Sequence, residues 1–220
     1  MLATLAAVLT LAACPANLAE GIESPASAKQ LITVEAKVAR TTHASLRTWV
    51  RVNGCWVAAA GPYAARLGKN GLSANRREGD GTTPAGTFRI GSTMYGNAPN
   101  PGVRFAYRRL RCGDWWDEDP FSPTYNSFQH VRCGTKPPFG GASEGMWQQP
   151  GAYPFLAVIE YNTRPVVPGR GSGIFLHAQT GGPTIGCVSL RRDQLAAVLR
   201  WLRPGSTPMI AIGTSKQLRS

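Results

Sequence analysis

The segment from residue 174 to residue 190 constrains this chain more than any other stretch. An apolar, strand-like run ends at His177, a turn rich in glycine follows, and Cys187 comes ten residues after the histidine. A cysteine attacks as its thiolate, and an unperturbed thiol with a pKa of about 8.5 is mostly protonated at neutral pH. An imidazole within hydrogen-bond reach accepts that proton and can return it to a leaving amine. The segment therefore predicts a nucleophilic Cys187 with His177 as its base.

Backbone groups on either side of this pair are candidates for supporting roles. Gly186 removes the side chain just before the sulfur, so the N–H groups of Gly186 and Cys187 are expected to face a developing oxyanion. The carbonyl of Ala178 is expected to orient the imidazole. His43 and His130 are expected at the surface. The alternative is an inert thiol, since free cysteine is among the most buried residue types.

Two motifs resemble the L,D-transpeptidase catalytic domain family. Residues 184–188, after a strand ending in His177, resemble its cysteine signature, and residues 77–90 resemble its Thr-Pro-x-Gly-x-Phe turn and strand. The resemblance covers about residues 30–213. It implies a mainly β, sandwich-like fold with one clear helix after the cysteine. It also implies acyl transfer on peptidoglycan stem peptides through a thioester at Cys187, with an amine or water as acceptor and no cofactor.

The chain departs from the family pattern at several positions. Ala178 stands where Gly is usual, Thr184 replaces Ser, and Ser189 stands where an Arg usually follows, with Arg191 two residues further on. The interval between His177 and Cys187 is shorter than is usual in the family, and it resembles the spacing in an actinobacterial exported subgroup. The Arg that usually stands at the position of Ser189 is a candidate anchor for a substrate carboxylate, and this chain lacks it. We expect Thr184, Ser189 and Arg191 to contact substrate, and a non-catalytic wall-binding protein on the same fold stays open as the alternative.

The start of the chain predicts export. Residues 1–13 form an apolar run that is too short to span a bilayer and is typical of a secretory signal. The sequence Leu-Ala-Ala before Cys14 resembles a lipobox, in which Cys14 carries a lipid anchor; the alternative is ordinary cleavage after Ala19. We therefore expect an export segment over 1–19, a tether over 20–30, and a location in the cell envelope or outside the cell.

Five cysteines bear on the redox state. Export implies an oxidising compartment, where disulfides persist. Cys112 and Cys133 flank a loop of twenty residues and are the predicted disulfide, worth about 3 kcal/mol in the chain-entropy model. Cys55 is expected to be a buried free thiol, although its pairing with either loop cysteine stays open.

Turn-forming residues are abundant, with 25 Gly and 17 Pro, which favours a β-rich domain. Asn53 and Gly54 give a strong hairpin signal. The apolar face over residues 191–203 predicts a helix. We expect the catalytic domain to span 31–213, followed by a tail over 214–220. Strands are expected at residues 31–34, 46–52, 55–58, 66–68, 87–90, 155–161, 173–177 and 208–212.

Residues 92–150 form a long irregular insert. Such an insert in a compact domain is usually functional or cross-linked, so we expect a cap over the substrate cleft, with Trp116 and Tyr125 contacting substrate. The alternative is that its tryptophans only cover a sheet face. Asp117 and Asp119 lack an accompanying histidine cluster, so no metal site is predicted.

The net charge is +12, from 24 basic and 12 acidic residues. Because the arginines are scattered, an anionic cell envelope is a better partner than nucleic acid. The alternative is that the charge only aids solubility. We expect a monomer.

Overall fold

A computed structural model describes residues 13–219 of the protein. Strands form 37% and helical residues 9% of it, with one α-helix among the described residues, which confirms the predicted mainly β fold. The elements are β1 (Gln30–Ala36), β2 (His43–Val52), β3 (Cys55–Arg66), β4 (Leu72–Ser73), β5 (Thr83–Pro84), β6 (Gly86–Gly96), β7 (Ala106–Arg109), β8 (Asp114–Asp117), β9 (Ser127–His130), β10 (Glu144–Gly145), β11 (Leu156–Ile159), β12 (Phe175–Ala178), β13 (Val188–Leu190), β14 (Met209–Thr214), α1 (Arg192–Trp201), and the 3-10 turns Ala19–Gly21, Met146–Gln148 and Pro204–Ser206.

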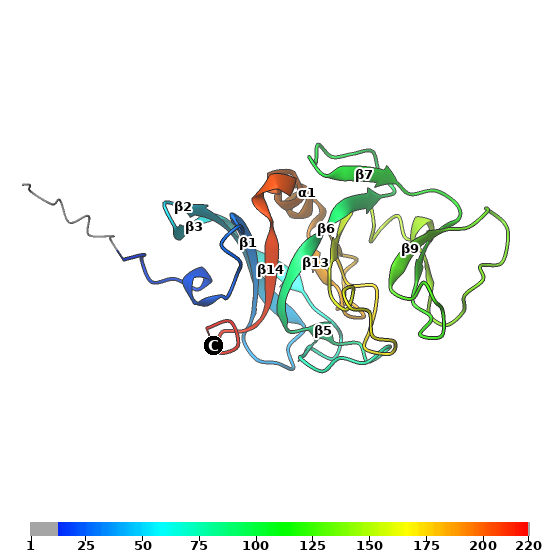
Figure 1. Cartoon of the computed structure of the whole chain (residues 1–220), viewed down its shortest axis with the longest axis horizontal. Helices are drawn as coiled ribbons and strands as arrows, with labels where there is room; N and C mark the ends of the chain where they lie inside the picture. The colour runs from blue at the N-terminus through cyan, green and yellow to red at the C-terminus, as the bar shows by residue number, and fades with distance from the viewer. Residues whose placement is uncertain (1–12, 220) are drawn as a thin grey trace, which may run out of the picture.

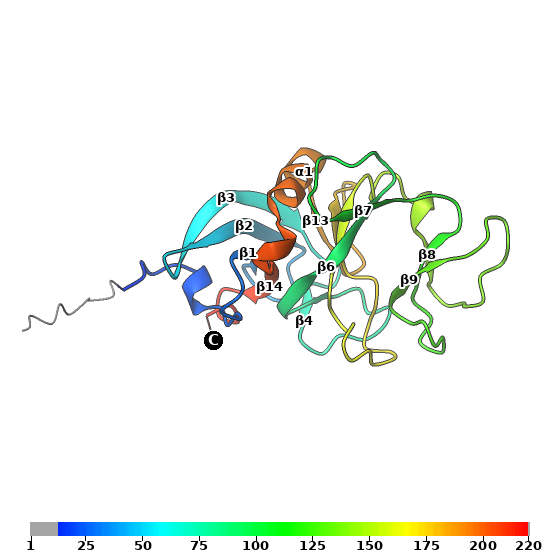
Figure 2. The ribbon, with the colours of Figure 1, turned by 45° about the horizontal axis from the view of Figure 1, so that its top comes forward.

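A large mixed sheet organises the fold. Its nine strands run in the order β11-β12-β13-β3-β2-β1-β14-β6-β7, and β11 also pairs with β6, so the sheet curls back on itself. Strands β12 and β13 pair in parallel, with His177 opposite Ser189. Helix α1 contacts β12 and β13 (Figures 1 and 2). Most of the core lies beneath this helix.

Helix α1 forms from an amphipathic run. Leu195, Val198 and Leu199 recur at helical spacing and are buried in the main core, while Arg192 and Arg200 are exposed. The helix is three residues shorter than predicted, one at its start and two at its end, where Leu202 leaves the helical conformation at ψ 144°. Burying such a leucine stabilises the fold by about 1.5–3 kcal/mol. The helix thus fixes the two strands that hold the candidate pair.

The N-terminal segment packs against the sheet, which corrects the predicted tether over 20–30. Ile22 and Ala28 are buried in a second cluster with Trp49 and Trp56. Glu20 adds a hydrogen bond, its carboxylate accepting the N–H of Trp56. Small apolar side chains within a polar, Ser- and Pro-containing run therefore serve as a cover for the sheet.

Two disulfides are present. Cys112 pairs with Cys133, the predicted pairing, with their Cα atoms 5.2 Å apart. Cys14 pairs with Cys55 at 5.3 Å, which corrects the expectation of a free Cys55 thiol. The packed N-terminal segment brings the two sulfurs together. A sulfur in this bond is not available to a lipid, so the predicted lipid anchor at Cys14 disagrees with the structure; residues 1–12 of the predicted export segment lie outside the described residues.

The insert over 92–150 is more regular than predicted. It contains β7 to β10, and three of these strands form a small sheet in the order β10-β8-β9. This small sheet lies to one side of the main sheet, where β8 and β9 are labelled in Figure 2, whereas β7 is the edge strand of the main sheet. Trp116 and Tyr153 pack with Phe175 in a third apolar cluster that also contains Cys187. The insert therefore covers the end of the sheet that carries the cysteine.

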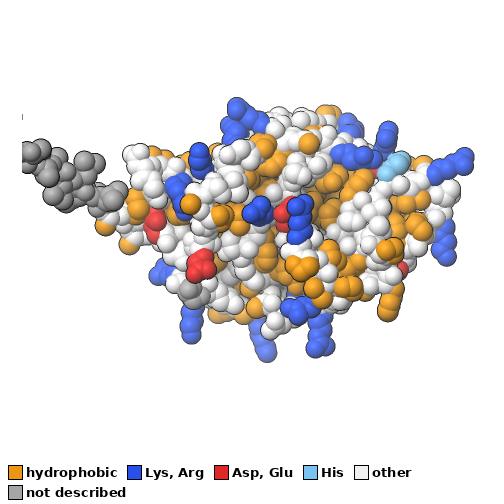
Figure 3. Space-filling view, in the orientation of Figure 1, with side chains coloured by type: hydrophobic (Ala, Val, Ile, Leu, Met, Phe, Trp, Pro, Cys, Tyr) orange, Lys and Arg blue, Asp and Glu red, His pale blue; other side chains and the backbone are white. Residues whose placement is uncertain are grey.

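Basic side chains are spread over the visible face in Figure 3, with few acidic groups between them. This agrees with the absence of a basic stripe in the sequence. Within residues 13–219, no helix has both the length and the apolar character needed to cross a bilayer.

Candidate active site

A cavity of about 560 Å³ lies between the sheet and the insert. His177 projects into it from β12, and Cys187 reaches it from the residue just before β13. The insert supplies the facing wall with Trp115, Glu118 and Glu144. The two chemically active side chains of the sequence motif therefore share one cavity, and the insert forms one of its walls.

Cys187 is the unpaired cysteine of the described residues, and it is buried. Its Sγ donates a hydrogen bond to the carbonyl of Gly173 at 3.3 Å and accepts one from the N–H of Phe175 at 3.3 Å. Burial raises the pKa of the Cys187 thiol to about 12, more than the Phe175 N–H lowers it. The resting sulfur is therefore a protonated thiol.

His177 is also buried, lines the same cavity and is neutral at pH 7. Its Nδ1 donates to the carbonyl of Ala178 at 2.8 Å, since a carbonyl oxygen only accepts. Burial lowers the pKa of His177 to about 4, against the opposite effect of the Ala178 and Ala152 carbonyls. With the hydrogen on Nδ1, Nε2 is left as the proton acceptor. The ring of Tyr153 packs edge-on against the imidazole at 5.5 Å between centroids.

The two side chains line one cavity, but among the described residues no hydrogen bond joins them. Among the contacts of the described residues, Cys187 Sγ bonds to residues 173 and 175, and the imidazole bonds to Ala178. Phe175 and His177 lie two positions apart on β12, so their side chains leave the same face of the strand. Direct proton transfer between the two side chains would require the Sγ–H to leave the Gly173 carbonyl.

The turn before the cysteine is held by Thr184. Its Oγ1 donates to the carbonyl of Cys187 at 2.7 Å and accepts the N–H of Gly186 at 3.1 Å. The Gly186 N–H is therefore engaged within the turn, which corrects its predicted role as an oxyanion donor. Gly186 has φ +149°, and a Cβ there would lie 2.9 Å from the carbonyl of Thr82. No larger residue fits at this position without a shift in the backbone.

Thr83 connects the two sequence motifs. Its buried hydroxyl accepts the N–H of Gly68 at 2.7 Å and donates to the carbonyl of Cys187 at 3.4 Å. Backbone bonds reinforce the link, because the Thr184 carbonyl accepts from Lys69 N–H at 2.8 Å. The Thr-Pro turn thus fixes the backbone that carries the nucleophile, although the two lie 104 residues apart in sequence.

Three carboxyl groups, those of Glu78, Glu118 and Glu144, line the cavity together with Cys187. Glu144 accepts from the Tyr153 hydroxyl at 2.7 Å, and Glu78 accepts from the Ser172 hydroxyl at 2.7 Å. Burial, followed by the carboxyl groups of Glu144 and Glu78, raises the pKa of Glu118 to about 8. Glu118 is therefore mostly protonated at neutral pH, and the cavity wall holds one proton that an ordinary carboxyl group would have lost.

The predicted substrate contacts are only partly brought together. Thr184 lines the cavity, but Ser189 is buried away from it and Arg191 is exposed, where it pairs with Asp193 at 3.3 Å. Arg191 and Ser189 therefore do not supply the missing carboxylate anchor.

The two predicted aromatic contacts also lie outside the cavity lining. Trp116 packs edge-on against Phe175 at 5.0 Å and donates from Nε1 to Asn126, so it belongs to the core. Tyr125 is buried, and its hydroxyl donates to Glu78, which itself lines the cavity. Trp115, the residue next to Trp116 in the sequence, lines the cavity instead.

Sequence reasoning missed most of the polar and aromatic residues that line the cavity beside the motif. Arg76, Glu118, Glu144 and Tyr153 come from separate segments and form no recognisable spacing. The one usable signal was Tyr153, which stands just before the predicted buried strand at 155–161.

Residues 38–210, most of the chain, match the family model of the L,D-transpeptidase catalytic domain, YkuD. The chain belongs to this family. Proteins of this family are generally cysteine acyltransferases that act on peptidoglycan peptides. No curated protein matches the chain. The match includes both motifs on which the resemblance was based, and it includes the insert that forms one wall of the cavity.

Proposed function

We propose that this L,D-transpeptidase family member is a cysteine acyltransferase acting on peptidoglycan stem peptides, with Cys187 as nucleophile and His177 as proton carrier. One observation carries the proposal. The unpaired thiol of the described residues and an imidazole whose Nδ1 is held by the Ala178 carbonyl line the same cavity, in a chain of this family.

The first half-reaction forms a thioester. The thiol proton of Cys187 passes to Nε2 of His177 as the sulfur attacks the carbonyl carbon before the terminal D-alanine. The C=O electrons move to the oxygen, and the Cys187 N–H stays the predicted donor to this oxyanion. As the oxyanion collapses, the C–N bond breaks and His177 gives its proton to the departing amine. D-Alanine leaves, and the acyl group remains on sulfur.

The second half-reaction releases the enzyme. A stem-peptide amine attacks the thioester carbon, its proton moves to His177, and the thiolate leaves and takes that proton back. The product is a cross-link. Attack by water instead gives a carboxylate, which is a carboxypeptidase outcome. The products of incubation with a stem peptide decide between the two acceptors.

The two disulfides favour an oxidising compartment, in agreement with export to the cell envelope or beyond. A basic enzyme in that compartment is attracted to anionic wall polymers. We propose that it acts there as a monomer.

Intact-mass analysis after incubation with a tetrapeptide or a carbapenem tests the proposal. The wild type is expected to gain one acyl adduct, which Cys187→Ala abolishes. The double variant Cys14→Ser/Cys55→Ser is the matched control, because it changes two other sulfurs and should keep the adduct. Labelling retained in Cys187→Ala would refute the assignment of the nucleophile. A wild type that binds the tetrapeptide but forms no adduct would favour the non-catalytic wall-binding protein.

A further inference from the structure

Arg76 is a buried arginine on the wall of the cavity. Its side chain is 3% exposed and comes from the turn between β4 and β5. Nη1 donates to the carbonyl of Ser172 at 3.3 Å, and Nε lies 3.5 Å from the carboxylate of Asp80. Within the described residues, Nη2 has no hydrogen-bond partner. Burying a guanidinium with so few partners costs desolvation free energy, so a binding role for its unpartnered face is worth testing.

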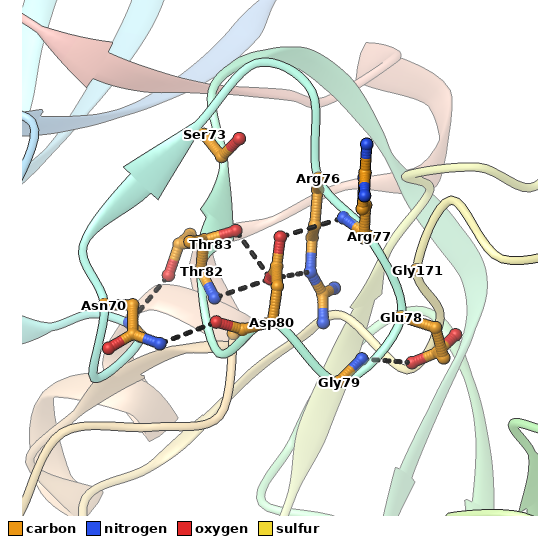
Figure 4. A network of polar contacts seen from close by, with 12 residues as sticks. Asn70, Ser73, Arg76, Arg77, Glu78, Gly79, Asp80, Thr82, Thr83 and Gly171 are labelled. Carbon is orange, nitrogen blue, oxygen red and sulfur yellow. Dashed lines mark hydrogen bonds and ion pairs between the residues drawn. The ribbon is translucent and has the colours of Figure 1, made fainter.

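Asp80 forms only a long ion pair with the Arg76 guanidinium. Its carboxylate accepts the N–H of Arg77 at 2.8 Å, and the N–H and hydroxyl of Thr82 at 2.8 and 2.7 Å (Figure 4). These shorter bonds, which outweigh burial and lower the pKa of Asp80, tie it to its own turn. Arg76 receives only the long 3.5 Å contact.

The other acidic groups near Arg76 are also engaged. Glu78 accepts from the hydroxyls of Tyr125 and Ser172. Glu118, whose pKa is raised to about 8 by burial and by the nearby carboxyl groups, is mostly neutral. The guanidinium therefore keeps a positive charge that faces the cavity without a close carboxylate partner.

Two glycines form the slot that holds the guanidinium beside the nucleophile. A Cβ on Gly186 would lie 3.0 Å from Nη2, and one on Gly171 would lie 3.2 Å from Cζ. Gly186 immediately precedes Cys187, and the charge of Arg76 acts to lower the pKa of that thiol. The free face of Arg76 thus lies next to the place where a scissile carbonyl would sit.

We propose that Arg76 binds the terminal α-carboxylate of the donor peptide, on the leaving-group side of the scissile bond. The inference rests on the proposed function. The leaving residue carries its carboxylate one residue beyond the attacked carbonyl, within about 4 Å along the chain. A guanidinium matches a carboxylate with charge-assisted hydrogen bonds. Arg76 would supply the anchor that Ser189 and Arg191 do not.

Binding to the Cys187→Ala protein tests this without chemistry. The probes are a tetrapeptide ending in D-alanine and the same peptide with a C-terminal amide, measured by calorimetry. Amidation is expected to weaken binding roughly 10- to 100-fold, the range for hydrogen bonds to a charged group. Adding Arg76→Gln should remove this preference, and Arg76→Lys should keep a smaller one, because it retains the charge but not the fork. Arg77→Gln is the matched control, since Arg77 is exposed in the same turn and should keep the full preference.

The outcomes separate the two proposals. An Arg76→Gln protein that still prefers the free carboxylate overturns the inference, since a merely structural arginine would weaken both peptides alike. If Arg76→Gln does not fold, a full preference in Arg76→Lys overturns it and a reduced one supports it. Arg76-dependent preference together with no acyl adduct on wild-type Cys187 would refute the enzyme and leave the binding role of Arg76 standing. Absence of binding by both peptides overturns the inference.

Discussion

The rate at which Cys187 reacts with iodoacetamide reports the resting charge state of the site. The other cysteines of the described residues are in disulfides, so intact-mass labelling follows Cys187 alone. Burial raises the pKa of this thiol to about 12, which leaves about one thiolate in ten thousand at pH 8. An exposed thiol with a pKa of about 8.5 would be roughly a quarter ionised at that pH. The alkylation rate at pH 8 should therefore be about a thousandfold below that of a small model thiol.

The pH profile separates a neutral pair from a preformed ion pair. Because the thiol ionises only at high pH, the rate should rise about tenfold per pH unit from pH 6 to pH 10 without a plateau. His177→Gln should change it little, since the imidazole, with its pKa lowered to about 4 by burial, carries no charge in that range. A rate that is flat from pH 6 and falls sharply in His177→Gln would refute the prediction that alkylation proceeds only through a freely ionised thiolate, because His177 would then be taking the thiol proton.

Three further predictions follow from the packing. Thr83→Val leaves a buried N–H without its acceptor and should lower the free energy of unfolding by about 1–3 kcal/mol, measured in urea, and slow acylation of Cys187. Burial on folding raises the pKa of Glu118 from 4.5 to about 8, so between these two pH values the folded protein holds a proton that the unfolded chain has lost. The free energy of unfolding should therefore fall as pH rises through this range, by at most about 5 kcal/mol. In urea titrations at pH 5 and pH 9, Glu118→Gln should remove the difference between the two pH values. Cys14→Ser/Cys55→Ser should cost about 4 kcal/mol by calorimetry, because that bond closes a separation of 41 residues.

Matched variants give each of these a control. Thr83→Ser keeps the hydroxyl and should stay near wild type, whereas an unchanged Thr83→Val would contradict the bridging role. Equal pH dependence in Glu118→Gln and wild type would show that Glu118 titrates normally. Full stability in the double serine variant would mean that the Cys14 bond does not restrict the unfolded chain.

Local patterns in the sequence predicted the elements that carry the pair. The Asn53-Gly54 dipeptide forms the turn between β2 and β3, with φ values of 50° and 87°, because these residues tolerate a left-handed backbone. The helix after the cysteine was predicted from its apolar spacing. Strand β3 runs much further than expected, since Ala and Gly at 58–61 are exposed and show no alternation.

Side-chain direction in β8 shows a limit of such reasoning. Adjacent residues of a strand face opposite sides, so one of Trp115 and Trp116 must face the core and the other the cavity. The sequence does not say which, because both are large and apolar. In the structure, Trp116 packs against Phe175 and Trp115 faces the cavity. The pairing of β8 with β9 and β10 sets which side chain points inward.

Contacts between distant segments were beyond prediction. The hydroxyl of Thr83 meets the Cys187 carbonyl, and Arg76 meets Gly186, only because the closed sheet brings the β4–β5 turn beside β13. Periodicity reports which face of an element is buried, but not which element covers it. The carboxyl groups of the insert were hidden for the same reason.

The bond between Cys14 and Cys55 bears on how the protein should be prepared. A recombinant chain starting at residue 31, the boundary that pattern alone suggests, would lack the layer over Trp56 and leave an orphan thiol on the hairpin. That second thiol would compete with Cys187 for every electrophile and oxidant, so adduct counts would exceed one per chain. Starting near residue 13 and producing the protein under oxidising conditions keeps the reactive sulfur of the site the one to be measured.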